Sequence, residues 1–355
     1  MSNLKINDVA RMAGVSVSTV SRILNGKPDV AETTRQRVWQ VIDTAGYNPD
    51  LQARRLRSNG SITQIISFHY PIDRIIFDPI RNAVLILEFI LGASAAVEAE
   101  NFLFNLVTTA FTGTQLIDLF RNSQSNGMIL AQVRQDDERI AALRDTNYPF
   151  IMIGRDGHEQ DVNFIDLDFK NAVLAAIDHL YQSGHRQIGM LDFPIILDQQ
   201  GYTPARQVSL ALREVPGKYP DLMLDRLQVG MSNKDTTKSI HHILDDHPQV
   251  SAIISVHGDC LAGIMDAFNQ CNLSIPRDMS LVLIASEKQC DGVFPDATRV
   301  DLPAEMMGYR AAQALIQRLK GQQVTPVQSL VQPQLIVGKT TSIISTINGQ
   351  GGNAY

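Results

Sequence analysis

The side chains best suited to metal chemistry form one cluster of histidines and aspartates, made up of His241, His242, Asp245, Asp246 and His247. On a helix, His241 and Asp245 share a face at i and i+4, but two ligands make a weak site because zinc takes four. A solvated helix end explains the cluster better. The motifs GxxxxGK[ST], GxGxxG, GxSxG and HExxH are absent from the sequence. We therefore predict no catalytic residue, no metal, no cofactor and no enzymatic activity.

The cysteines and the apolar segments bear on where the protein works. Cys260, Cys271 and Cys290 are far apart and odd in number, which argues against a disulfide framework. We expect them to be buried apolar side chains. The longest apolar run, 83–97, contains Glu88 and is shorter than the ~18 to 20 residues that span a bilayer. The opening residues, MSNLKINDVA, lack the apolar core of a signal peptide. The sequence thus predicts a cytoplasmic protein without a membrane partner.

Charge is distributed unevenly along the 355 residues, whose formal net charge is -6. Residues 1–60 hold nine Lys/Arg against five Asp/Glu, a net charge of +4, and the remainder carries -10. A basic segment joined to an acidic body predicts that the first sixty residues alone meet a polyanion such as DNA. The length allows two or three domains.

Three short helices would position these basic residues. An apolar stripe over 9–13 predicts the first helix, which Gly14 would end. Ser16 is a natural N-cap for a second helix over 17–24, and a third is expected over 32–45. The side chains expected to face inward are Val9, Ala10, Ala13, Val20, Ile23, Leu24, Val38, Val41, Ile42 and Ala45. The first two helices and their tight turn make a helix-turn-helix, whose second helix would enter a major groove.

Residues 6–50 resemble, without a gap, the DNA-binding segment of the lac-repressor/galactose-repressor family. The resemblance rests on the runs Ala13-Gly14-Val15-Ser16, Thr19-Val20-Ser21-Arg22 and Asn25-Gly26. It implies that base edges are read by Val17, Ser18 and Arg22, because an arginine fork matches guanine O6 and N7. It also implies that phosphates are held by Ser16, Thr19, Ser21 and Asn25.

Two positions depart from this family. Lys5 stands where a Thr usually caps the first helix, and Ala31 stands where a Ser usually caps the third. The loss of a cap costs roughly 0.5 to 2 kcal/mol. We therefore expect a head that is less stable in isolation but keeps its fold.

The next segment, 47–60, resembles the hinge helix of the same family. The resemblance implies that Leu56, with Ala53 one turn before it, is an apolar wedge for the minor groove, and that Arg54, Arg55 and Arg57 meet phosphates. Repulsion among these three arginines disfavours a helix in free solution, so we expect the hinge to fold on DNA. A basic flexible linker without a wedge is the alternative.

The remaining three hundred residues alternate between apolar runs and helical patterns. Strands are predicted over 62–68, 102–107, 128–130, 150–153, 187–191, 227–230, 252–256 and 281–284. Helices are predicted over 79–100, 113–123, 136–146, 170–183, 204–214, 233–246 and 260–272. This alternation predicts parallel sheets with helices on both faces. Two such units in series would hold a ligand at the carboxyl ends of their strands.

The family resemblance continues here and implies the fold of periplasmic sugar-binding proteins. The predicted fold class is thus α/β, with an all-α helix-turn-helix head and a periplasmic-binding-protein-like body of two parallel-sheet lobes. The predicted divisions are a head at 1–46, a hinge at 47–60, a first lobe at about 61–160 and 291–323, a second lobe at about 161–290 and 324–344, and a flexible tail at 345–355.

Candidate effector contacts follow from the same alignment: Asp78, Arg155, Arg206, Asp259 and Glu287. Two have plain structural alternatives, because Arg206 could be a surface residue of a helix and Asp259 could be an N-cap. Ser209 replaces the glycine of the R-x-x-G segment, and Gly154 replaces a carboxylate. Because unpaired sugar hydroxyls are costly to bury, a simple hexose fits this pocket poorly. A carbohydrate-related effector is expected from the family alone.

We therefore predict a homodimeric transcriptional regulator, a repressor, that binds a near-palindromic operator in double-stranded DNA and responds to a small-molecule effector. The main alternative is a small-molecule-binding protein whose DNA binding is secondary or lost, motivated by Lys5 and Ala31. An enzyme with a fused DNA-binding head is a third class, motivated by the large α/β body alone.

Overall fold

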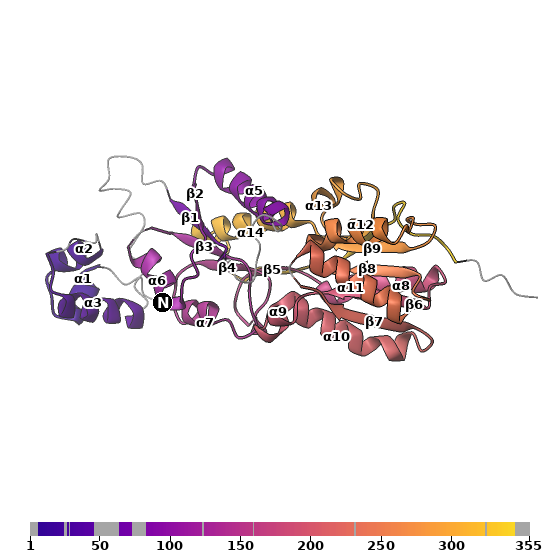
Figure 1. Ribbon diagram of the computed structural model, residues 1–355. Helices are drawn as coiled ribbons and strands as arrows, with labels where there is room; N and C mark the ends of the chain where they lie inside the picture. The colour runs from indigo at the N-terminus through magenta and orange to yellow at the C-terminus, as the bar shows by residue number, and fades with distance from the viewer. Residues whose placement is uncertain are drawn as a thin grey trace, which may run out of the picture. The chain divides into compact units, whose positions relative to one another are not determined.

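The computed structural model describes most of the chain, in segments (Figure 1). The described residues are 6–24, 27, 29–45, 64–72, 83–122, 124–158, 160–230, 232–323 and 325–344. The chain divides into two compact units: the first holds 1–72, 90–165 and 305–328, and the second holds 73–89, 166–304 and 329–355. No helix in the described segments is long and apolar enough to cross a membrane.

The N-terminal head consists of α1 (Ile6–Ala13), α2 (Val17–Leu24) and α3 (Glu32–Ala45), which pack on one another (Figure 1). Gly14 ends α1 with a φ of +64°, a backbone conformation that favours glycine. Its N–H bonds to Arg11 O and the next N–H, that of Val15, bonds to Ala10 O. This pair of bonds is a Schellman motif, which closes the helix and sets the turn into α2.

A small apolar core holds the three helices of the head together. Its buried members are Val9, Ala10, Ala13, Val20, Ile23, Leu24, Val38 and Ile42, with Val41 partly buried against them. Ala45 is half-buried. The helix ranges and inward faces predicted from apolar spacing are therefore confirmed for the head.

The first sheet has six strands in the order β11-β5-β4-β3-β1-β2. The strands are β1 (Ile65–His69), β2 (Leu103–Val107), β3 (Gly127–Leu130), β4 (Phe150–Ile153), β5 (Phe164–Leu167) and β11 (Gln328–Val331). The ladders joining β2, β1, β3, β4 and β5 are parallel. This order changes direction between β1 and β3, the switch point at which doubly wound sheets take their ligands.

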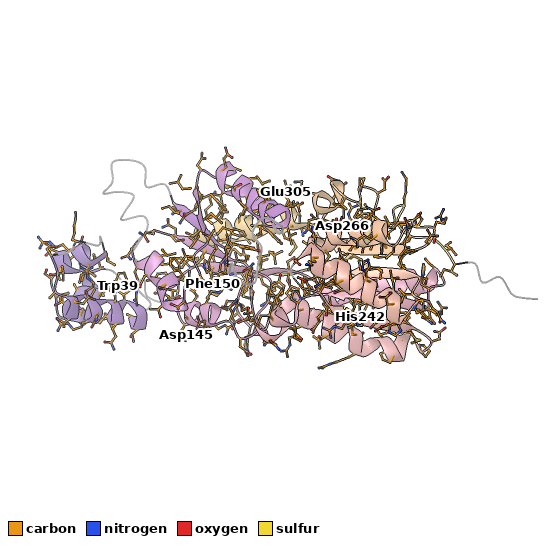
Figure 2. The ribbon with its side chains drawn as sticks, in the orientation of Figure 1. Trp39, Asp145, Phe150, His242, Asp266 and Glu305 are labelled. Carbon is orange, nitrogen blue, oxygen red and sulfur yellow. The ribbon has the colours of Figure 1, made fainter. Side chains whose placement is uncertain are left out.

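Helices connect and follow the strands of this sheet. They are α5 (Ala83–Ala99), α6 (Gly113–Arg121), α7 (Glu138–Arg144) and α14 (Ala304–Leu319). Thr112 caps α6 with a capping box, and Asp137 caps α7. The buried core includes Phe150, which lies among the strands in Figure 2, together with Met128 and Leu143.

The second sheet repeats this plan in the order β12-β10-β9-β8-β6-β7. The strands are β6 (Gln187–Asp192), β7 (Met223–Gln228), β8 (Ala252–Ser255), β9 (Ser280–Ala285), β10 (Thr298–Asp301) and β12 (Gln334–Ile336). The ladders are parallel except that of β10 with β12, which is antiparallel. Its helices are α8 (Phe169–Gln182), α9 (Ile195–Gln199), α10 (Thr203–Lys218), α11 (Asn233–Asp246), η1 (Gly258–Cys260), α12 (Leu261–Gln270) and α13 (Glu287–Asp291). The predicted fold class is confirmed.

Several details differ from the sequence predictions. The strand predicted at 227–230 lies at 223–228, as β7. The prediction missed the first part of this strand because the charged residues Asp225 and Arg226 interrupt its apolar run. The predicted lobe boundaries also differ from the observed sheets for three strands. They put β5 and β11 in the second lobe and β10 in the first, whereas β5 and β11 lie in the first sheet and β10 lies in the second. β10 has the sequence TRVD and is largely buried. Its polar residues do not form the apolar run by which the other buried strands were predicted. The head, hinge and tail boundaries stay predictions.

Candidate functional site

The start of α2 is an exposed edge of the head whose backbone is capped by a serine. Ser16 Oγ accepts the Thr19 N–H at 3.1 Å and lies 2.8 Å from Thr19 Oγ1 and 2.7 Å from Ser18 Oγ. The predicted N-cap at Ser16 is therefore confirmed. Three hydroxyl groups within hydrogen-bond distance at a helix N-terminus, where backbone N–H groups are also free, suit an anionic oxygen.

The predicted base-reading residues share the face of α2 that the core does not use. Val20, Ile23 and Leu24 are buried against α1 and α3. Val17 is 38% exposed, and Ser18 and Arg22 are also exposed. An apolar side chain left in water beside a hydroxyl and a guanidinium gives the mixture of groups that contacts base edges in a major groove.

Arg22 lies on the last turn of α2 and has a partner in the loop that follows. Its Nη1 is 3.2 Å from Oδ2 of Asp29, and both side chains are exposed. Ser21, the neighbouring predicted phosphate contact, is half-buried. The α2 face thus carries one fixed cation at its C-terminal end and a cluster of hydroxyls at its N-terminal end.

Several predicted site residues lie outside the described residues. They are Asn25, Ala53, Arg54, Arg55, Leu56, Arg57 and Asp78. The side chain of Asp259 is also outside them, although its backbone lies in η1. Cys260, rather than Asp259, occupies the N-cap position of α12, so the alternative prediction of Asp259 as that cap is wrong.

The carboxyl edge of the first sheet holds a buried charged cluster that the sequence did not reveal. His69 ends β1, and its Nδ1 and Nε2 lie 3.2 Å from Arg139 Nη1 and 2.9 Å from the Thr109 carbonyl. Arg139 also pairs with the buried carboxylate of Asp137. Burial lowers the pKa of His69 to about 4, so at neutral pH its Nε2–H donates to Thr109 while Nδ1 accepts from Arg139. Burial opposes the ionisation of Asp137, but Arg139 outweighs it and holds the pKa of Asp137 below its usual value.

The corresponding edge of the second sheet is organised by another buried carboxylate. Asp192 ends β6 and accepts the Arg226 Nε–H at 2.6 Å, while Arg226 Nη2 donates to Ser209 Oγ on α10 at 3.1 Å. Burial raises the pKa of Asp192, and Arg226 offsets part of that effect. Ser209, which replaces the family-type glycine, therefore ties α10 to β7.

Aromatic rings follow Asp192 at the same edge. Phe193 stacks on His257 with ring centroids 5.0 Å apart and meets Tyr202 edge-on at 5.6 Å. Cys260 Sγ lies 3.3 Å from Nε2 of His257 and is buried. These residues follow β6 and β8, the two strands that flank the switch point of the sheet.

Known proteins and protein families resemble this chain in both its head and its body. A model of the lacI family of bacterial regulatory proteins matches residues 5–50, and one of the periplasmic binding protein-like domain matches 177–341. The chain is 24% identical over 339 residues to the HTH-type transcriptional regulator CelR of Thermobifida fusca, over 93% of this chain and 96% of CelR. Residues 5–50 thus match the lacI family of bacterial regulatory proteins, and the chain is similar to an HTH-type transcriptional regulator over nearly its whole length.

Solved structures have the same fold as this chain. A complex of the transcriptional regulator CelR with cellobiose matches with a TM-score of 0.65 and 21% identity, over 95% of this chain and 99% of that one. The lac repressor dimer bound to operator and the anti-inducer ONPF matches with a TM-score of 0.65 and 19% identity, over 96% of this chain and 100% of that one. The chain thus shares the fold of these two structures.

The remaining predicted effector contacts are spread over several elements. Arg206 is exposed on the first turns of α10. Glu287 begins α13, is 72% exposed, and lies 3.7 Å from Arg299 Nη2. Arg155 is half-buried and follows Gly154, whose φ of +112° favours glycine. Their roles stay predictions.

Two histidines of the predicted metal-type cluster lie beside carboxylates. His242, labelled in Figure 2, lies 3.2 Å from Asp246, and His247 lies 3.6 Å from Asp225. Within the described part of the chain, no three His, Cys, Asp or Glu side chains form a group that could hold a metal ion.

Proposed function

We propose that this protein is a sequence-specific DNA-binding transcriptional regulator, a repressor, that binds a near-palindromic operator as a homodimer and responds to a small-molecule effector. One observation carries the proposal: α2 buries Val20, Ile23 and Leu24 while leaving Val17, Ser18 and Arg22 exposed on its other face. A helix held in this way can enter a major groove without loss of its own core.

Each exposed group has a role that follows from its chemistry. Arg22 donates two N–H groups to one guanine, at O6 and N7, and Val17 and Ser18 contact neighbouring base edges. Phosphates are held by Ser16, Thr19, Ser21 and Asn25, which fix the register on the duplex. In the hinge, Arg54, Arg55 and Arg57 neutralise phosphates while Ala53 and Leu56 enter the minor groove.

An apolar stripe on α5 supports the proposed dimer. Val84, Leu87 and Leu91 are 41%, 45% and 50% exposed and lie at i, i+3 and i+7 on one helix face. Monomeric proteins seldom leave such a row of branched side chains in water. A second copy of the chain would cover the stripe, and a twofold dimer matches a near-palindromic site.

The effector is proposed to contact the carboxyl ends of the strands in each sheet. The candidates are Asp78, Arg155, Arg206, Asp259 and Glu287. The CelR structure with cellobiose supports a carbohydrate-related ligand, and the doubly wound order of both sheets supports a ligand at this edge. Effector binding changes the affinity for operator because the two equilibria are linked.

The test compares the purified chain on DNA from upstream of its own gene with random duplex of equal length, by fluorescence anisotropy at ~0.15 M salt. We expect the best upstream site to bind about 10³-fold or more tightly than random DNA. Arg22→Ala should reduce that ratio by about 5- to 150-fold. Equal affinity for both duplexes, with and without metabolite extract, would instead support a small-molecule-binding protein without operator recognition.

A further inference from the structure

Asp29 is the acidic partner of the arginine that we propose as a base reader. Its Oδ2 lies 3.2 Å from Arg22 Nη1, and the side chains of Arg22 and Asp29 are 61% and 54% exposed. The pair joins the last turn of α2 to the loop before α3. An acidic side chain beside a DNA-reading cation calls for an explanation, because it repels the phosphates that the head must approach.

The backbone of Lys27, two residues before Asp29, makes two hydrogen bonds. The Lys27 N–H donates to Arg22 O at 3.0 Å, which holds the loop against the end of α2. From α3, Arg35 Nη2 donates to the Lys27 carbonyl at 2.8 Å, and the Arg35 side chain is only 22% exposed. The backbone two residues before Asp29 is therefore tied both to the end of α2 and to α3.

Stability is a poor explanation for this pair. Water screens an ion pair between two exposed side chains, so such pairs add little to the free energy of folding. The fold of the head comes instead from its apolar core, which includes Val9, Val20 and Val38, all fully buried. What the pair does change is the direction that a long side chain favours among the many rotamers open to it.

We propose that Asp29 is a positioning residue for sequence recognition, holding the Arg22 fork toward a guanine edge and away from phosphates. This inference rests on the proposed function. A free guanidinium pairs with phosphates, which are present at every site, and so raises affinity for all sequences alike. With Asp29 beside it, Arg22 is partly neutralised on random DNA and keeps its two parallel donors for guanine O6 and N7.

The experiment measures discrimination by the full chain carrying Asp29→Asn, on the best upstream site and on random duplex, by anisotropy over a range of salt. Discrimination is the ratio of the two dissociation constants. We expect Asp29→Asn to bind random DNA more tightly, with a salt slope steeper by about one. We expect discrimination to fall about five- to tenfold, within the range of one bidentate contact. Asp29→Glu, which keeps the charge, should restore part of the loss.

A matched control removes the same charge elsewhere in the head. Asp8 lies 3.0 Å from Arg11 on α1, in a pair that is likewise solvent-accessible. Asp8→Asn should raise affinity for random DNA and for the best site alike, leaving discrimination unchanged. In an Arg22→Ala background, Asp29→Asn should also leave discrimination unchanged, because the group that it positions is gone.

The outcomes separate the two proposals. If the wild-type chain does not discriminate, the proposed function fails. If the wild type discriminates and Asp29→Asn behaves as Asp8→Asn does, the role of Asp29 is refuted while the function stands. An equal loss of discrimination in the Arg22→Ala background would also refute it, since Asp29 would then act without Arg22. Circular dichroism of each variant checks that the head is folded.

Discussion

Arg226 on β7 pairs with the buried carboxylate of Asp192 on the neighbouring strand β6, Nε to Oδ2 at 2.6 Å, while the same guanidinium holds Ser209 of α10. One side chain thus fixes the end of a strand, its sheet neighbour and the helix that carries Arg206. The arrangement gives Ser209, a departure from the family pattern, a structural role.

Arg226→Ala should destabilise the second unit by about 3 to 5 kcal/mol, because it leaves Asp192 buried without its cationic partner. Lys339→Ala is the matched control: it breaks a pair with Asp296 in which both side chains are exposed and should cost no more than about 1 kcal/mol. Urea unfolding followed by circular dichroism measures both.

The double variant Asp192→Leu with Arg226→Met gives a second check on this pair. It leaves no buried charge, so much of the lost stability should return. If Arg226→Ala is as stable as Lys339→Ala, the pair does not contribute as we expect.

The buried imidazole of His69 should make folding stability depend on pH. Its folded pKa is about 4 against an ordinary 6.5, so between these values the unfolded chain binds a proton that the folded chain excludes. Stability should therefore fall as the pH drops from 6.5 to 4, by about 3 kcal/mol in total, and be unaffected by this group above 6.5.

Urea unfolding at several pH values tests the contribution of His69. His69→Gln keeps one donor and one acceptor without a titratable ring, so its stability should vary less between pH 4 and 6.5. His242→Gln, at an exposed site on α11, should retain the wild-type profile. Parallel profiles for wild type and His69→Gln would rule out this linkage.

How far the sequence could predict the structure depended on how local each determinant is. The head was predictable because Ser16 caps α2 and Gly14 ends α1, and both act on backbone groups within a few residues. β7 was misplaced because the charge of Arg226 is compensated by Asp192, 34 residues away in the chain. One signal in the sequence pointed to His69 and to Asp192: each is a single titratable residue at the end of an apolar strand, in IISFH and IGMLD respectively. The alternation of apolar and polar residues does not say what such a residue does.

Ala31→Ser should stabilise the head by about 1 kcal/mol. Ala31 precedes α3, and its carbonyl already accepts the N–H groups of Thr34 and Arg35. A serine Oγ at this position could accept the Thr33 or Thr34 N–H and so add a hydrogen bond to the first turn. Trp39 on α3 is the only tryptophan in the chain, so its fluorescence during urea unfolding reports on the head. Ala31→Val, which supplies no acceptor, should bring no such gain.

Arg206→Ala should remove the response to effector and leave operator binding intact. The side chain is exposed on α10, a helix that Ser209 and Arg226 hold in place, so its removal should not disturb the fold. A thermal-shift screen of sugars and related metabolites on the wild type first identifies a ligand, since a molecule that binds only the folded state raises its Tm. Arg213→Ala, at another exposed arginine of α10, is the control and should keep the full shift. A ligand that raises the Tm of Arg206→Ala as much as that of the wild type would show that the guanidinium does not contact the effector, and the binding residues should then be sought at Arg155 and Glu287.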